Sequence, residues 1–111
     1  MTLWDPEKIS TPGVLSPETY EQCITAIYGY GDPLLSMCEK QYRGYKNMDA
    51  DDAHRDGWIY TIQQSFLQAE QDLNGKALFY ALILAINDHE TMEPERKREL
   101  IGMLLPDAIF T

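Results

Sequence analysis

Ten consecutive apolar residues, Ala77 to Ile86, constrain the fold of this chain more than any other feature of its sequence. The run lies within the segment Lys76 to Asn87, and its length and its alanine and leucine content favour an α-helix over a buried strand. A helix that is apolar on every side is stable only where other elements cover it. The run is also far too short to span a bilayer. The sequence therefore predicts a central helix around which the rest of the chain packs.

Two amphipathic helices are predicted ahead of the central one. The first begins at Ser16-Pro17-Glu18, which combines an N-cap serine, a proline at the first helical position and an acid facing the helix dipole. It ends at Gly29 and Gly31, and Asp32-Pro33 starts the second helix at once. A connection this short predicts an antiparallel hairpin. The apolar faces comprise Tyr20, Ile24, Ile27 and Tyr28, then Leu34, Leu35, Cys38, Tyr42 and Tyr45.

A third helix is clear by Trp58, and a fifth begins near Pro94. The third has apolar residues spaced three and four apart, and Asn74-Gly75 is predicted to stop it in a left-handed conformation. Pro106 ends the fifth helix, and the tail 108–110 is expected to dock on the bundle. The apolar positions of the third helix are Ile59, Ile62, Phe66, Ala69 and Leu73.

Together these patterns predict an all-α fold, a compact bundle of about five helices with an irregular N-terminal arm. Residues 1–15 form the arm, packed on the body, and residues 16–111 form a single helical domain. A chain of 111 residues is too short for two stable domains, and its 44% hydrophobic content is enough to fill one core. Cys23 and Cys38 lie on apolar helix faces, where we expect reduced, buried thiols.

The formal charge of −9 limits the partners that the chain can bind. A negative field repels nucleic acid phosphates and anionic lipids, and it accelerates association with a basic protein surface. The other interpretation is that the charge serves solubility alone. The first residues show neither the basic start nor the apolar run of a signal peptide, so a cytoplasmic location, in the producing cell or in an infected host cell, is expected.

The segment from Asp52 to Gln63 resembles an EF-hand calcium loop. The match is carried by residues at positions 1, 5, 6 and 8 of such a loop: Asp52, Asp56, Gly57 and Ile59. Position 3 is His54 and position 12 is Gln63, whereas calcium prefers oxygen donors and a bidentate glutamate at these places. Tight calcium binding is therefore not expected, and the other interpretation is an acidic first turn of the third helix.

Catalytic and cofactor motifs are missing from the sequence. It contains no nucleophile elbow, no phosphate-binding loop and no dinucleotide fingerprint. His54 and His89 are far apart, and His89 is expected to cap the fourth helix or lie on its surface. Arg96-Lys97-Arg98 is interpreted as a solvated face. We predict no catalytic residue, no cofactor and no metal, although a desolvated carboxylate in a cleft would reopen the question of an enzyme.

Aromatic residues gather near the acidic run that precedes the third helix, and these two features together define the predicted partner-binding patch. An exposed aromatic beside carboxylates suits the core of an interface. The alternative is that the aromatics belong to the core. Segment 40–46, which alternates cations with aromatics, is then core with a basic rim that includes Lys40 and Lys46, and not a platform for single-stranded nucleic acid. The predicted patch comprises Asp49, Asp51, Asp52, Asp56, Trp58, Tyr60, Tyr42 and Tyr45.

The leading hypothesis is a small, acidic, non-enzymatic protein that inhibits a macromolecular partner by covering a basic functional surface. Immunity proteins and phage-encoded anti-defence inhibitors share this profile. The partner would be a basic protein, such as a nucleic-acid-binding protein, a nuclease or a toxin, with no direct contact to nucleic acid or membrane. Both a monomer and a homodimer fit the pattern. The alternative is a degenerate EF-hand-like regulatory or scaffolding domain that binds a partner helix.

Overall fold

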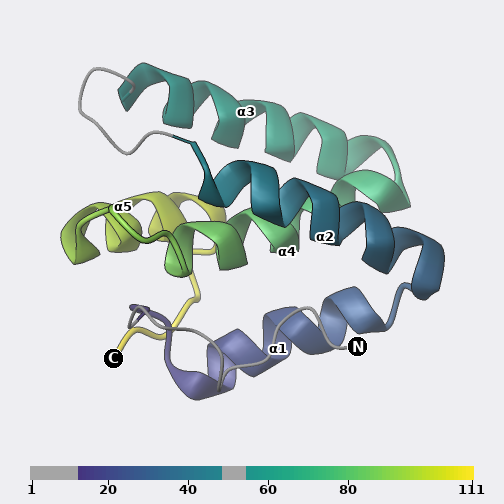
Figure 1. The fold of residues 1–111 in the computed structure, drawn as a ribbon, viewed down its shortest axis with the longest axis horizontal. Helices are drawn as coiled ribbons and strands as arrows, with labels where there is room; N and C mark the ends of the chain where they lie inside the picture. The colour runs from purple at the N-terminus through teal and green to yellow at the C-terminus, as the bar shows by residue number, and fades with distance from the viewer. Residues whose placement is uncertain (1–12, 49–54) are drawn as a thin grey trace.

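Helices account for most of the computed structural model, which describes residues 13–48 and 55–111, with only the backbone of residues 55 and 56 (Figure 1). This part of the chain forms five α-helices, so the predicted all-α bundle is confirmed. Their bounds are α1 Pro17–Tyr28, α2 Asp32–Lys46, α3 Arg55–Gln71, α4 Leu73–Asn87 and α5 Pro94–Leu104.

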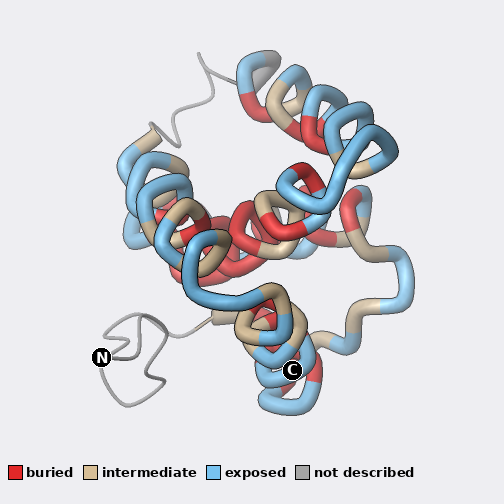
Figure 2. Tube along the Cα trace, turned by 90° about the vertical axis from the view of Figure 1, so that its right-hand side faces the viewer, coloured by how far each residue is buried: buried red, intermediate tan, exposed pale blue. Residues whose placement is uncertain are grey.

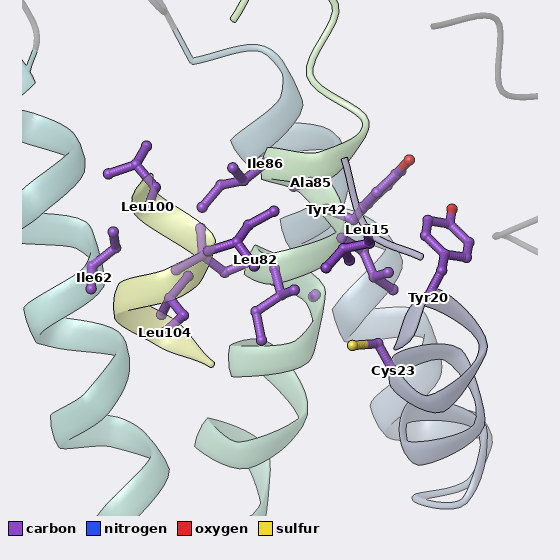
Figure 3. Packing of buried hydrophobic residues seen from close by; sticks show 14 of the residues in the cluster. Leu15, Tyr20, Cys23, Tyr42, Ile62, Leu82, Ala85, Ile86, Leu100 and Leu104 are labelled. Carbon is purple, nitrogen blue, oxygen red and sulfur yellow. The ribbon is translucent and has the colours of Figure 1, made fainter. Parts of the chain in front are cut away.

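The helix α4 is the centre of the bundle, as the apolar run predicts. It contacts each of the other four helices, and it is the buried helix at the middle of the tube in Figure 2. Every residue from Ala81 to His89 is buried. In Figure 3, Ile62, Leu100 and Leu104 lie on one side of Leu82, and residues of α1, α2 and the segment before α1 lie on the other side. The core is therefore built as one continuous layer around α4.

The hairpin of α1 and α2 follows the predicted signals. The Ser16 hydroxyl accepts a hydrogen bond from the Thr19 N–H at 3.2 Å, and Pro17 occupies the first helical position. Gly31 adopts a φ of 95°, the left-handed region that glycine tolerates, immediately before α2. The two helices pack against each other as well as against α4, so the short connection produces the expected pairing.

The junction of α3 and α4 corrects the sequence analysis. The break falls at Asp72, and Asn74 and Gly75 belong to the first turn of α4 rather than to a left-handed stop. The Asp72 carboxylate caps α4 by accepting a hydrogen bond from the Gly75 N–H at 2.7 Å. A Cβ on Gly75 would lie 2.0 Å from the Gln68 carbonyl oxygen, so glycine is required for the close approach of the two backbones.

The buried face of α3 also differs from the predicted one. Trp58, Ile62 and Ser65 are buried at intervals of four and three residues, whereas Phe66 and Leu73 are exposed. Leu73 no longer belongs to α3, because the chain turns at Asp72. The side of α3 that packs on α4 and α5 is therefore rotated toward Trp58, relative to the line of apolar positions predicted for this helix.

The EF-hand resemblance is contradicted by the backbone of α3. The helix begins at Arg55, which would be position 4 of the loop, and continues through Gln63 at position 12. Gly57 lies inside this helix with no positive φ, so it makes no loop turn. Asp52 and His54 lie outside the described residues. An EF-hand holds its ion in an extended loop between two helices, so the degenerate EF-hand alternative is not carried further.

Both ends of the described chain meet on the surface of the bundle. The Ser16 N–H donates to the Ile109 carbonyl at 2.8 Å, and the Thr111 N–H donates to the Val14 carbonyl at 2.9 Å. These bonds flank an antiparallel bridge between Leu15 and Phe110. The tail therefore docks as expected, next to the segment that leads into α1 (Figure 1). Among the helices that are described, none combines the length and the apolar composition that a membrane crossing requires.

Candidate functional site

The four aromatic residues of the predicted patch, which the structure describes, do not share one surface. Trp58 is 1% exposed and Tyr42 is also buried, so neither offers a surface for a partner. Tyr45 is half-buried, and Tyr60 is 63% exposed. Two of the four aromatic residues, Tyr42 and Trp58, are therefore buried rather than exposed. Their positions on α2 and α3 turn these side chains toward α4.

The acidic half of the predicted patch falls on a part of the chain that is not described. Asp49, Asp51 and Asp52 lie outside the described residues, as does the side chain of Asp56. Exposed carboxylates in the described chain are distributed over several elements rather than gathered in one place. They include Glu18 and Glu21 on α1, Glu70 and Asp72 at the junction of α3 and α4, and Glu90, Glu93, Glu95 and Glu99 around α5.

Tyr42 belongs instead to a buried polar cluster at the end of α4. The Asp88 carboxylate is 1% exposed and accepts hydrogen bonds from the hydroxyls of Tyr20, at 2.9 Å, and Tyr42, at 2.6 Å. Its other oxygen accepts from the Asn87 amide nitrogen at 2.9 Å. A buried carboxylate is costly unless such donors surround it. Asp88 therefore ties α1 and α2 to the end of α4.

Asn87 extends this cluster to the segment before α1 and to α5. Its side-chain oxygen accepts from the backbone N–H groups of Val14, at 2.8 Å, and Leu15, at 2.9 Å. Its carbonyl accepts from the Lys97 ammonium at 2.8 Å, and Lys97 is only 2% exposed. The expectation that Arg96-Lys97-Arg98 is a solvated face is therefore wrong for Lys97, although Arg96 and Glu99 do form an ion pair at 2.9 Å.

His89 completes the cluster by joining two loops. Its Nε2 lies 2.6 Å from the Met48 carbonyl, and its Nδ1 accepts from the N–H groups of Thr91 and Met92. Because Nδ1 accepts from backbone N–H groups, Nε2 is the ring nitrogen that donates to the Met48 carbonyl. The ring of Trp58 packs edge-on against it, with centroids 5.8 Å apart. His89 is thus a buried link, not the surface residue that its place near a helix end indicated.

We name Asn87, Asp88, His89 and Lys97 the polar hub. Every helix reaches it: Tyr20 from α1, Tyr42 from α2, Trp58 from α3, and Lys97 from α5. Burial raises the pKa of Asp88, and the three hydrogen bonds that it accepts oppose this rise without cancelling it. Burial lowers the pKa of Lys97. Because its charged groups are enclosed, the hub fixes the helices relative to one another rather than presenting groups to a substrate.

The raised pKa of Asp88 predicts a specific pH dependence of stability. When the folded pKa exceeds the unfolded value of about 3.9, the folded state binds more protons in the interval between them. The stability that Asp88 contributes is therefore full below the unfolded pKa and is lost as the pH rises through the folded pKa. We expect the difference in unfolding free energy between wild type and Asp88→Asn to fall over that interval, by at most about 1.4 kcal/mol per pH unit. Urea titrations of both proteins from acid to neutral pH would measure this difference, and a difference that rises with pH contradicts it.

Two features of the sequence indicate that the hub residues are buried. Asn87, Asp88 and His89 directly follow an apolar run, where burial is expected to continue. Lys97 stands three and four residues before Leu100 and Ile101, on the apolar face of α5 rather than on its solvated face. The hydrogen-bond partners, however, come from distant segments, which no local pattern identifies.

The exposed side of α3 is the most interface-like surface of the described chain. Tyr60, Gln63, Gln64, Leu67 and Gln71 are exposed and share one side of the helix, and we call them the α3 face. Tyr60 and Leu67 are 63% and 52% exposed, two large apolar side chains two turns apart. From Gly57 to Gln71 the only charged residue is Glu70, in a chain of net charge −9. Interface centres are depleted of charge and enriched in aromatics.

A cleft adjoins the α3 face. It has a volume of about 310 Å³ and lies between α3, the start of α4 and the connection of α1 to α2. The centroids of Phe66 and Phe79 are 5.5 Å apart, and those of Phe79 and Tyr80 are 5.8 Å apart at a right-angled, edge-to-face inclination. Glu70 belongs to the cleft and borders the α3 face on the helix. We call this the aromatic cleft; its lining comprises Tyr30, Phe66, Ala69, Glu70, Lys76, Phe79 and Tyr80.

Several basic side chains of the described chain are held by local partners. Lys97 is buried in the hub, and Arg43 pairs with Glu39 on α2. The Lys46 ammonium lies 5.2 Å from the centroid of the Tyr42 ring, which fits the interpretation of segment 40–46 as core with a basic rim. With 18 acidic and 9 basic residues, the chain nevertheless carries a net charge of −9.

The described residues offer little for metal or thiol chemistry. Within them, no group of three His, Cys, Asp or Glu side chains is arranged to hold a metal ion. Cys23 and Cys38 are buried and unpaired with each other as free thiols, and burial raises the pKa of each to about 11. A thiol with that pKa is almost fully protonated at neutral pH, so it is a poor nucleophile.

Comparison with known proteins adds no family to this description. No protein-family model, no curated protein and no solved structure matches the chain.

Proposed function

We propose that the chain is a small, non-catalytic binding protein that covers a basic functional surface of a macromolecular partner, as an immunity protein or a phage-encoded inhibitor does. The α3 face is the observation that supports this most directly. Tyr60 and Leu67 are large apolar side chains exposed on a helix side without charge, which is the composition that the centres of interfaces favour. They would form the centre of the interface.

Charge complements this apolar centre. The net charge of −9 accelerates the encounter with a basic partner, and carboxylates at the edge of the face select against an acidic one. Glu70 and Asp72 border the α3 face, and the run from Asp49 to Asp56 leads into its first turn along the chain. The proposed interface thus keeps Tyr60 from the predicted patch and replaces Trp58 and Tyr42 by Leu67 and its glutamine neighbours.

A pull-down with matched variants tests this proposal. The full chain serves as bait in lysates of its source and of a host, at low and moderate salt, beside the variants Tyr60→Ser/Leu67→Ser and Ile109→Ser. Ile109 is as exposed as Leu67 but belongs to the docked tail, and the C-terminal end of this tail lies far from α3 in Figure 1. We expect a dominant basic protein whose capture weakens with salt, and whose affinity falls at least tenfold for the double variant, about the loss of one interface hot spot. The Ile109→Ser bait should capture it as the wild type does.

Two results would refute this function. One is the capture of no basic protein at either salt concentration. The other is equal capture by wild type and the Tyr60→Ser/Leu67→Ser variant, because the partner would then bind another surface. Unfolding of each bait in urea checks that the exposed substitutions leave stability within about 0.5 kcal/mol of wild type.

A further inference from the structure

The aromatic cleft combines ring surfaces with a carboxylate at one place on the molecule. Tyr30, Phe66, Phe79 and Tyr80 come from three separate elements and line the same cavity, together with Glu70. A ring face carries partial negative charge, so it attracts a cation placed above it. The lining also includes Lys76, which offsets the charge of Glu70, so the four rings are what favours a cationic group with a flat, weakly hydrated surface.

We propose that the aromatic cleft receives an arginine side chain of the partner. This inference rests on the proposed function and names the group by which the basic partner is anchored. A guanidinium is planar, stacks on aromatic rings and donates hydrogen bonds in a fixed fork that matches a carboxylate such as that of Glu70. A lysine ammonium is more strongly hydrated and fits this lining less well. The volume of about 310 Å³ admits one long side chain, not a second helix.

The charged residues of the cleft predict in which direction each substitution should change the binding of a cation. Glu70 and Lys76 both line the cavity, and both are exposed. A bound guanidinium is attracted by the first and repelled by the second. Removing the carboxylate must therefore weaken binding, and removing the ammonium must strengthen it. An anionic occupant would reverse both effects.

The experiment uses arginine amide as the probe and citrulline amide as its control, since the citrulline side chain is an uncharged isostere of the arginine side chain. Side-chain NMR signals of Phe66, Phe79 and Tyr80 are followed while each probe is added to the full chain. We expect saturable shifts with arginine amide and much smaller ones with citrulline amide. Glu70→Gln should weaken arginine amide binding about two- to fivefold and Lys76→Gln should strengthen it by a similar factor, because both groups are exposed to solvent. Glu18→Gln, on α1, is the matched control and should change nothing.

Several results would overturn the arginine assignment. They are the absence of saturable shifts, equal binding of citrulline amide, tighter binding of phenylalanine amide, or reversed effects of the two charge variants. Phe66→Leu gives an independent check, since it removes one of the four rings and should reduce the preference for arginine over citrulline. Partner capture that is unchanged in Glu70→Gln and Phe66→Leu would refute the anchor but leave the proposed function in place. Arginine amide binding in a chain that captures no basic protein would refute the proposed function alone.

Discussion

Replacing Asp88 by alanine is expected to lower the free energy of unfolding by about 3–5 kcal/mol, a large share of the stability of a domain this size. The side chain is fully enclosed, and it is the acceptor for two tyrosine hydroxyls and one amide group. Without it, the buried hydroxyls of Tyr20 and Tyr42 lose the bonds that they donate to Asp88, and each loss costs about 1–3 kcal/mol.

The loss spreads beyond those hydroxyls because the polar hub is shared by all five helices. Asn87 uses one side of its amide to hold Val14 and Leu15 and the other side to bond Asp88. Removing the carboxylate also leaves the buried ammonium of Lys97 without the negative charge that partly offsets its desolvation. An uncompensated buried charge is a strongly destabilising feature.

Urea unfolding of wild type, Asp88→Ala, Asp88→Asn and Asp107→Ala would measure the effect. Asp107 is an exposed carboxylate in the tail, so its replacement controls for the change in net charge and should stay within about 0.5 kcal/mol. Asp88→Asn keeps an acceptor oxygen and should lose less than Asp88→Ala. A loss below about 1 kcal/mol for Asp88→Ala would show that the hub is not what holds the helices together.

Local signals were sufficient to predict the helices that begin and end with recognisable residues. Ser16 and Pro17 start α1, Gly31 supplies the left-handed turn before α2, and Pro94 starts α5. These features act over three or four residues, which is the range that a single sequence reveals. The apolar run of α4 also predicts where this helix lies in the fold, because a helix without a polar side must be covered by other elements.

The junction of α3 and α4 was predicted wrongly because two local signals compete there. Asn74-Gly75 is typical of a helix end, whereas Asp72 is typical of a helix start. The competition is decided by a contact between helices, the approach of Gly75 to the Gln68 carbonyl. That contact exists only after α3 and α4 have packed together.

The polar hub and the aromatic cleft were not predicted for the same reason. The sequence predicts a solvated position for Lys97, since buried charges are rare, and the partners of Asp88 and Lys97 lie far away in the sequence. Phe66 and Phe79 were assigned to the core, although together they form the wall of an open cleft. Sequence spacing placed aromatics near carboxylates, but it could not tell which side of each helix faces α4.

Trp58 and Tyr60 make this distinction measurable, because they stand two residues apart on α3 and were assigned to the same patch. Trp58→Ala is expected to cost about 3–5 kcal/mol of unfolding free energy, since it empties a buried site and removes the ring that packs on His89. Tyr60→Ala creates no cavity, because the side chain is exposed. The free energy of unfolding of this variant should therefore stay within about 0.5 kcal/mol of wild type.

Affinity for the captured partner should show the opposite pattern to stability, with the loss in Tyr60→Ala and not in Trp58→Ala. Tyr60→Ala should lose affinity while it remains fully folded, because the side chain contributes its area only at the interface. Trp58→Ala should bind with wild-type affinity per folded molecule, so its apparent loss should match the unfolded fraction measured by urea titration under the same conditions. Equal stability of the two variants would contradict the burial of Trp58. A folded Trp58→Ala variant that fails to bind would return Trp58 to the interface and require α3 to present a different side to the partner.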